Sequence, residues 1–494
     1  MQTACPSPFN LTAHVLARAN AMGDKPALCV LHRDHAETLS FAALKAAVLG
    51  TATGLLALGL APGDRVLMRL GNTVDFPILY LAALAVDLVP VPTSAQLTVP
   101  EITAMAALIR PELIVAAPGV ALPEPAGRSL TLDALRALRD YPPAAYAMGD
   151  PNRPGYIVFS SGTSGRARGV VHAHRAIWAR RSMIDGWYGL RADDRLLHAG
   201  AFNWTYTLGT GLMDPWATGA TALIPGTDIG PADLAPLLAR HGATIFAAAP
   251  GVYRQMLRHV LPPLPVLRHG LSAGEKLPEV TRAAWTQATG TAIYEAYGMS
   301  ECSTFLSGSP AAPAPPGTLG RAQPGRRIAI LGAMGPQPVG QPGTIAVAAD
   351  DPGLMLGYLD APGATAEKFR EGWFLTGDTG MMDDTGAVTY LGRDDDMMNA
   401  GGYRVSPIEV EQVLAAFPGL GEAAVIEARV KADTTIIAAL YTAAEDLDET
   451  ALARHCAARL ARYKCPRLFR RIDAIPRGAN NKILRRQLRD SFKA

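Results

Sequence analysis

Apolar residues recur along the first 250 residues at spacings that alternate between helical and strand-like. Residues 40–60 carry Leu, Ala and Val at helical spacing up to Gly59, and residues 77–86 form a second helix-like apolar stretch. Short apolar runs of strand length surround them, at 65–68, 88–92, 113–115, 156–159, 221–224 and 244–248. This alternation predicts a layered α/β domain with largely parallel sheets.

The pattern changes at about residue 308. Segment 310–342 is rich in Pro and Gly, and short apolar strands are predicted at 328–331, 345–347 and 388–391. They predict a small β-rich subdomain over about 308–394. The remaining chain predicts an α+β unit, with helices at 407–417 and 449–463 and strands at 423–427 and 435–441. We therefore expect an N-terminal domain over 1–394 and a mobile C-terminal domain over 395–494.

Composition narrows the class of protein. The chain has 494 residues, of which 49% are apolar and 18% charged, and its net charge is +2, which argues against a nucleic-acid binder. Its five cysteines form no Cys-x-x-Cys pair, which favours a reducing cytoplasm over a disulfide framework or a zinc site. The longest apolar stretch, 76–92, is broken by Asp87 and short for a membrane span, so we expect no membrane anchor.

Residues 159–169 form a polar, glycine-rich segment directly after the predicted strand 156–158. The segment contains three glycines, four hydroxyl side chains and two arginines. Glycines let backbone N–H groups converge on an anion, and hydroxyl and guanidinium groups add donors for a polyphosphate. A flexible polar turn is equally compatible with this run alone, and the run does not match the Walker pattern.

Four further blocks follow in the order 294–301 (Tyr-Glu-Ala-Tyr-Gly-Met-Ser-Glu), 372–378 (Gly-Trp-Phe-Leu-Thr-Gly-Asp), 392–395 (Gly-Arg-Asp-Asp) and 476–485 (Pro-Arg-Gly-Ala-Asn-Asn-Lys-Ile-Leu-Arg). Together with the glycine-rich segment, they resemble the adenylate-forming superfamily of acyl-CoA synthetases, carrier-protein adenylation domains and firefly-type luciferases. The resemblance covers essentially the whole chain, and five collinear blocks are far more specific than one.

The resemblance implies a site for ATP and Mg²⁺. The residues it assigns to the β- and γ-phosphates are Ser161, Gly162, Thr163, Ser164, Gly165 and Arg168. The residues it assigns to the adenosine are Gly274, Glu275 and Lys276 beside the adenine, Tyr297 stacked on it, and Asp378 and Arg393 at the ribose. Ser300 would bond the α-phosphate and Glu301 would ligate Mg²⁺, a hard cation that prefers oxygen ligands. Arg168 stands where the family usually has lysine. The arginine keeps the positive charge, but its guanidinium is a planar, fork-shaped group and not a compact ammonium.

In the last hundred residues, the resemblance implies the groups that act with coenzyme A. Lys482 would stabilise the charge that develops during adenylation, although Asn481 precedes it where the family commonly has Gly. Asp395 would be the hinge, and Gly401 and Gly402 would line the pantetheine tunnel. Tyr463, Lys464 and Arg467 would meet the nucleotide end of coenzyme A. The segment 454–493 contains thirteen Lys or Arg residues and only two Asp, which also favours a polyanionic partner. A run of charges of this kind is, however, most often a solvent-exposed surface without a partner.

By position, the acyl pocket should include Phe202, Asn203, Trp204, Tyr206, Ala273 and Met299, and residues 303–305 are further candidates. These residues are aromatic or neutral, and no Arg or Lys among them could hold a second carboxylate, which argues against dicarboxylates. An aromatic ring and a short or medium aliphatic chain remain open as substrates.

The most specific prediction is an AMP-forming acyl- or aryl-CoA synthetase that activates a small-molecule carboxylate with Mg-ATP and transfers the acyl group to coenzyme A. The first alternative is an adenylating enzyme that loads a carrier-protein phosphopantetheine. The second is a catalytically silent nucleotide-binding regulator. No nucleic-acid partner is expected, and a homodimer stays open as an assembly.

Overall fold

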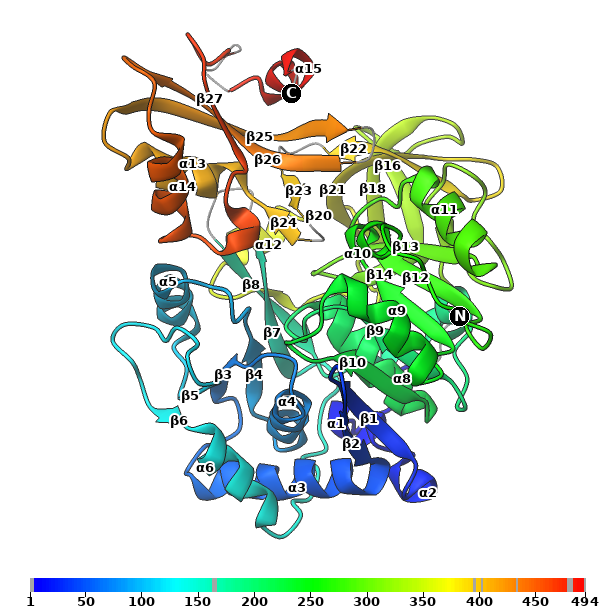
Figure 1. Ribbon diagram of the computed structural model, residues 1–494. Coiled ribbons are helices and arrows are strands. Elements are labelled where there is room, and N and C mark those ends of the chain that lie inside the picture. The colour runs from blue at the N-terminus through cyan, green and yellow to red at the C-terminus, as the bar shows by residue number, and fades with distance from the viewer. Residues whose placement is uncertain are drawn as a thin grey trace.

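The computed structural model describes residues 4–161, 167–393, 397–400, 403–431, 434–477 and 483–492. Its largest layer is a nine-stranded sheet whose central strands are all parallel, with antiparallel pairs at the two edges (Figure 1). In spatial order its strands are β15 (Arg321–Ala322), β14 (Ser303–Ser307), β13 (Ile293–Met299), β12 (His269–Ala273), β11 (Ile245–Ala248), β9 (Arg195–His198), β10 (Thr221–Pro225), β1 (Pro26–Leu31) and β2 (Ala36–Ser40).

Two smaller sheets belong to the same N-terminal part. An all-parallel sheet consists of β4 (Val89–Pro92), β3 (Arg65–Arg69), β5 (Leu113–Ala116) and β6 (Ser129–Leu130). An antiparallel sheet consists of β19 (Gly357–Tyr358), β8 (Ala167–Ala173) and β7 (Pro154–Ser161). The run 156–159, expected within the parallel pattern, therefore pairs antiparallel with β8, because the chain returns directly beside it instead of crossing over through a helix.

The helices of the N-terminal part cover these sheets. They are α1 (Leu11–Val15), α2 (Ala19–Met22), α3 (Phe41–Ala57), α4 (Asp75–Ala85), α5 (Val99–Ile109), α6 (Leu132–Ala137), α7 (Ala176–Ala179), α8 (Asp214–Thr218), α9 (Pro231–Arg240), α10 (Pro250–Met256), α11 (Glu279–Thr289) and α12 (Pro362–Ala366), with short 3-10 or π turns η1 (Leu138–Asp140), η2 (Ile184–Tyr188) and η3 (Thr207–Met213). Every residue of α4 is buried, as expected for a helix that is apolar on all sides. Its one charged residue, Asp75, forms ion pairs with Arg136 and Arg139.

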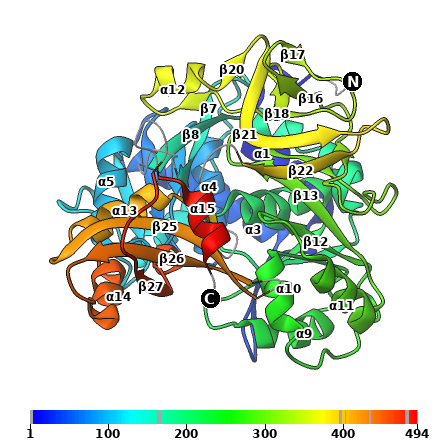
Figure 2. The ribbon, with the colours of Figure 1, turned by 90° about the horizontal axis from the view of Figure 1, so that it is seen from above.

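The predicted β-rich segment forms a six-stranded antiparallel sheet. Its strands are β17 (Gly335–Pro336), β16 (Ile328–Gly332), β18 (Pro342–Ala348), β21 (Trp373–Met382), β20 (Phe369–Arg370) and β22 (Val388–Arg393), which pairs with β21. In Figure 2 this sheet lies across the molecule from α9 and α11.

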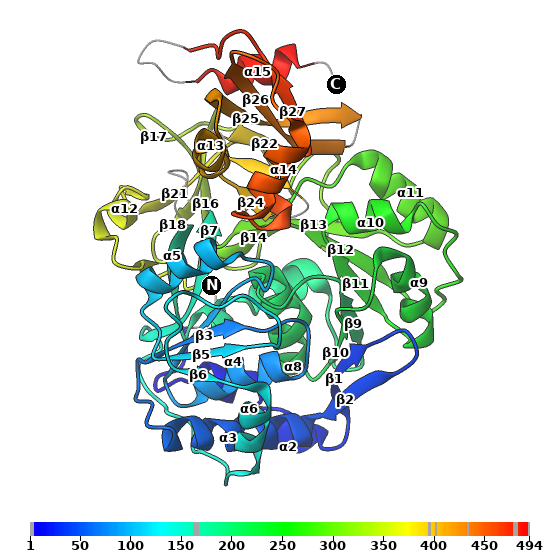
Figure 3. The ribbon, with the colours of Figure 1, turned by 60° about the vertical axis from the view of Figure 1, so that its left-hand side comes forward.

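The C-terminal elements stack on one end of the molecule, with α13 (Pro407–Ala415) above α5 (Figures 1 and 3). They are β23 (Met398–Ala400), β24 (Tyr403–Val405), α13 (Pro407–Ala415), β25 (Leu420–Lys431), β26 (Thr434–Ala443), α14 (Glu449–Ala457), η4 (Arg462–Lys464), β27 (Leu468–Arg471) and α15 (Arg485–Ser491). The helix expected over 449–463 ends at Ala457, and η4 then turns Lys464 toward the N-terminal part. No helix in the described ranges has the length and apolar character needed to cross a bilayer.

Candidate active site

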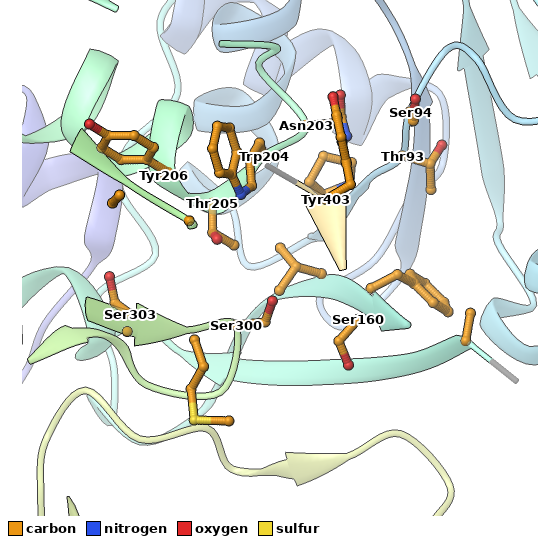
Figure 4. A pocket seen from close by; sticks show the side chains of 18 of the residues that line it. Thr93, Ser94, Ser160, Asn203, Trp204, Thr205, Tyr206, Ser300, Ser303 and Tyr403 are labelled. Atoms are coloured by element: carbon orange, nitrogen blue, oxygen red, sulfur yellow. The ribbon is translucent and has the colours of Figure 1, made fainter. Parts of the chain in front are cut away.

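A cavity of about 190 Å³ lies where the N-terminal part meets the C-terminal elements. Its walls come from β4, β7, η3, the ends of β12 and β13, and from α13 and η4. Of the residues expected in the acyl pocket, seven line it, namely Asn203, Trp204, Tyr206, Ala273, Met299, Ser303 and Thr304. Phe202 and Phe305 do not line it and are buried in the hydrophobic core. Ser300, Gly274 and Ser160 line the same cavity, so the structure brings the expected acyl and phosphate regions together (Figure 4).

Glu301 is buried beside this cavity, with 5% of its surface exposed. Its Oε1 accepts a hydrogen bond of 2.8 Å from the Tyr358 hydroxyl, while its buried Oε2 has no hydrogen-bond partner within the described parts of the chain. The Arg168 guanidinium lies 5.2 Å from the centre of the Tyr358 ring, on the same side of the site. Burial and the Glu301 charge raise the pKa of Tyr358, so its hydroxyl stays a donor. A buried carboxylate oxygen without a partner fits a ligand for Mg²⁺.

Tyr297 and Asp378, 81 residues apart in the chain, meet directly. The Tyr297 hydroxyl donates a hydrogen bond to Asp378 Oδ2. Asp378 also stands opposite Arg393 in the β21–β22 register. Burial, followed by the Asp378 charge, raises the pKa of Tyr297 far above its usual range. The residues expected around adenine and ribose are therefore neighbours.

The segment Gly274, Glu275 and Lys276 follows β12 at the edge of the same site. Gly274 has a φ of 95°, a conformation that favours glycine. Glu275 is half-buried and Lys276 is exposed.

A hydrogen bond positions the backbone at Ser300, because His172 Nε2 lies 2.7 Å from the Ser300 carbonyl oxygen. Burial lowers the pKa of His172 to about 4, so the neutral ring donates through Nε2.

The C-terminal part contributes aromatic and charged groups to the lining of the cavity. Tyr403 stacks on Tyr463 with 4.1 Å between ring centres, and also on Trp204 at 6.2 Å. Lys464 is buried rather than displayed on the surface, with its Nζ 2.8 Å from Glu101 Oε1 and 2.6 Å from Glu409 Oε1. Arg467, by contrast, is exposed and does not line the cavity.

The Lys464 contacts join the two parts of the molecule, since Glu101 belongs to α5 and Glu409 to α13. Burial opposes the charge of Lys464, but Tyr463 and the two carboxylates together raise its pKa above the usual value, so the pairs are formed at neutral pH. The Thr98 hydroxyl adds a 3.0 Å hydrogen bond to the Arg459 carbonyl oxygen at the same contact.

Lys464→Met should loosen this contact by about 1–3 kcal/mol, because two buried carboxylates lose their shared cation. Hydrogen exchange measures the result, and amides of α5 should exchange faster than in the parent protein. Arg467→Met is the matched control, since it removes the same charge three residues later from an exposed side chain. Equal α5 exchange in the two variants would contradict the role of Lys464.

The residues expected in the acyl pocket include no arginine or lysine, but the cavity that they line also contains two basic residues. Arg180 and Lys464 both line the cavity, and Arg180 is 6% exposed. Sequence reasoning missed Arg180 because Arg180 and Arg181 look alike in the sequence, whereas Arg181 is exposed and lies over Trp178 at 4.0 Å. It also missed Thr93, Ser94, Tyr403 and Glu409, which line the cavity without any local sequence signal.

Several expected site residues lie outside the described parts of the chain. They are Gly162, Thr163, Ser164, Gly165, Asp395, Gly401, Gly402 and Lys482. For Ser161 and Arg393 only the backbone placement is described, at the end of β7 and of β22.

Residues 15–359 match the family of AMP-binding enzymes, and residues 409–482 match the C-terminal domain of AMP-binding enzymes. The chain belongs to this family. The predicted family, the α/β fold class and the acid–thiol ligase class are confirmed.

Among curated proteins, the chain is 29% identical over 520 residues to a 3-hydroxybenzoate–CoA ligase of Aromatoleum sp. (strain CIB), covering 96% of this chain and 95% of that protein. It is 31% identical over 473 residues to a benzoate–CoA ligase of Thauera aromatica, covering 88% and 87%. Among solved structures, an o-succinylbenzoate CoA synthetase (MenE) from Bacillus subtilis, bound with the product analogue OSB-NCoA, superposes with a TM-score of 0.86. That comparison covers 97% of this chain and 98% of the other at 24% identity, and supports the fold.

Proposed function

We propose that this ligase activates an aromatic monocarboxylic acid with Mg-ATP and transfers the acyl group to coenzyme A. The observation that carries the proposal is one cavity lined by Trp204, Tyr206 and Ser300, with Glu301 buried next to Ser300 in the chain. Flat aromatic walls suit a ring. Relatives named for benzoate and 3-hydroxybenzoate support the same class of acid.

In the first step, the substrate carboxylate attacks the α-phosphate, which forms an acyl-adenylate and releases pyrophosphate. Ser161 to Gly165 and Arg168 would bind the departing phosphates, Tyr297, Asp378 and Arg393 would position the adenosine, and Lys482 would stabilise the charge at the α-phosphate. Glu301 would hold Mg²⁺ through its buried Oε2, and the cation supplies charge neutralisation for the phosphates.

In the second step, the thiolate of coenzyme A attacks the acyl carbon and AMP leaves. Gly401 and Gly402 would allow the linear thiol arm to approach, and rotation at Asp395 would bring residues 395–494 into place. The stacked Tyr403 and Tyr463 rings line the cavity from the same C-terminal part and would flank that arm.

ATP–pyrophosphate exchange across benzoate, hydroxybenzoates and short and medium alkanoates tests the first step. AMP release with and without coenzyme A tests the second. Exchange with aromatic acids and AMP release that requires coenzyme A are expected. Exchange with alkanoates alone would contradict the aromatic substrate, and AMP release that requires a phosphopantetheinylated carrier protein would contradict free coenzyme A as the acceptor.

A further inference from the structure

One end of the cavity is lined by polar side chains. Arg180, Thr210 and Ser303 line the same cavity as Tyr206. In Figure 4, Ser303 lies on the same side of the cavity as Tyr206, away from Ser160 and Ser94, and Ser300 lies between. Ser303 is therefore placed beyond the position expected for the α-phosphate, at the end where the acyl group would extend.

Arg180 lies at the centre of this polar end of the cavity, and the Asp214 carboxylate balances the positive charge of its guanidinium. Arg180 Nε lies 3.1 Å and 3.0 Å from the two Asp214 oxygens, and Nη2 lies 2.6 Å from Asp214 Oδ2. Nη2 also donates to the Tyr188 hydroxyl at 2.9 Å. Burial acts against the charge of Arg180, but Asp214 raises its pKa, so the guanidinium stays charged and the buried pair has no net charge.

The remaining arm of the guanidinium, Nη1, donates to Ser303 Oγ. Within the described ranges, Ser303 Oγ is the one hydrogen-bond acceptor of Nη1, and the Ser303 hydroxyl proton has no acceptor. Ser303 holds this position with a φ of 61°, a conformation uncommon for residues other than glycine. The hydroxyl is thus fixed by Arg180 with its own donor still available at the cavity wall.

We propose that Ser303, positioned by the Arg180–Asp214 pair, is a specificity-determining residue that binds an uncharged hydroxyl group on the ring of the aromatic acid. This inference rests on the proposed function. The Ser303 O–H donates to the oxygen of the substituent, and the guanidinium polarises that donor. A second carboxylate is disfavoured there, because Asp214 already cancels the charge of Arg180.

The test compares kcat/KM for benzoate, 3-hydroxybenzoate, 4-hydroxybenzoate, isophthalate and terephthalate in the parent protein, Ser303→Ala and Ser303→Gly. Glycine accepts the positive φ without strain, so the second variant removes the hydroxyl without adding steric strain to the backbone. Ser307→Ala is the matched control, since Ser307 lies in the same strand, β14, but is buried and donates to the Gly186 carbonyl oxygen outside the cavity.

In the parent protein, we expect a hydroxybenzoate to be preferred over benzoate. Both Ser303 variants should lower the ratio of kcat/KM for that hydroxybenzoate to kcat/KM for benzoate by about 10-fold, whereas Ser307→Ala should leave this ratio unchanged. An unchanged ratio in the Ser303 variants, or a preference for either dicarboxylate, would overturn the inference while leaving the ligase proposal intact. Failure of the parent protein to activate any aromatic acid would instead overturn the proposed function on which it rests.

Discussion

Glu301→Gln should lower ATP–pyrophosphate exchange by about 10²–10³-fold, as expected when one charged group that stabilises the transition state is removed. The substitution keeps the volume of the side chain, and the amide oxygen can still accept the hydrogen bond from Tyr358. What it removes is the negative charge at Oε2, which is buried without a hydrogen-bond partner among the described residues. The loss should therefore appear in the reaction and in its dependence on Mg²⁺ concentration, and not in the melting temperature.

Tyr358→Phe provides the matched comparison, because it removes the hydrogen bond at the other oxygen of the same carboxylate and keeps the charge. Its exchange rate should fall by less than about 10-fold, in line with the loss of one hydrogen bond. If Glu301→Gln exchanged pyrophosphate as fast as the parent protein over the whole Mg²⁺ range, Glu301 would have no part in holding the cation.

Asp214→Leu should destabilise the protein by about 3–5 kcal/mol, the cost of leaving one partner of a buried ion pair without its counter-charge. The Arg180 and Asp214 side chains are 7% and 5% exposed, so water cannot replace the carboxylate. Tyr188 would also lose the acceptor of its 2.8 Å hydrogen bond. Urea unfolding followed by circular dichroism measures the change in stability.

The double variant Arg180→Met/Asp214→Leu should recover most of this loss, because replacing both ions by apolar side chains leaves no buried charge unpaired. A double variant less stable than Asp214→Leu alone would mean that the pair contributes through its hydrogen bonds to Tyr188 and Ser303 more than through charge compensation.

Regular elements with a strong local pattern were predicted closely. The helix expected over 40–60 is α3 (Phe41–Ala57), and the strand expected over 65–68 is β3 (Arg65–Arg69). The sequence was less informative where tertiary contacts redirect the chain. The helix expected to reach residue 463 ends at Ala457, and Lys464 instead enters a buried contact with Glu101, 363 residues away.

In the candidate site, too, the residues that belong to local motifs were predicted, and those brought in by tertiary contacts were not. Tyr297, Ser300, Glu301 and Asp378 were predicted because their motifs place chemically specific groups within a few residues of one another. Arg180 was not predicted, since nothing local distinguishes it from the exposed Arg181 that follows it.

The sequence by itself determined the family, the α/β class and the groups expected to act on ATP, because short motifs carry that chemistry in their own residue types. Only the tertiary structure decided the polar end of the cavity, where Arg180 lies. Arg180 meets Asp214 and Ser303 across 34 and 123 residues of sequence, and their pairing follows from the packing of the elements between them. Whether an arginine in a pocket wall presents a net charge or a neutral pair depends on such a contact, and no local pattern of residues encodes it.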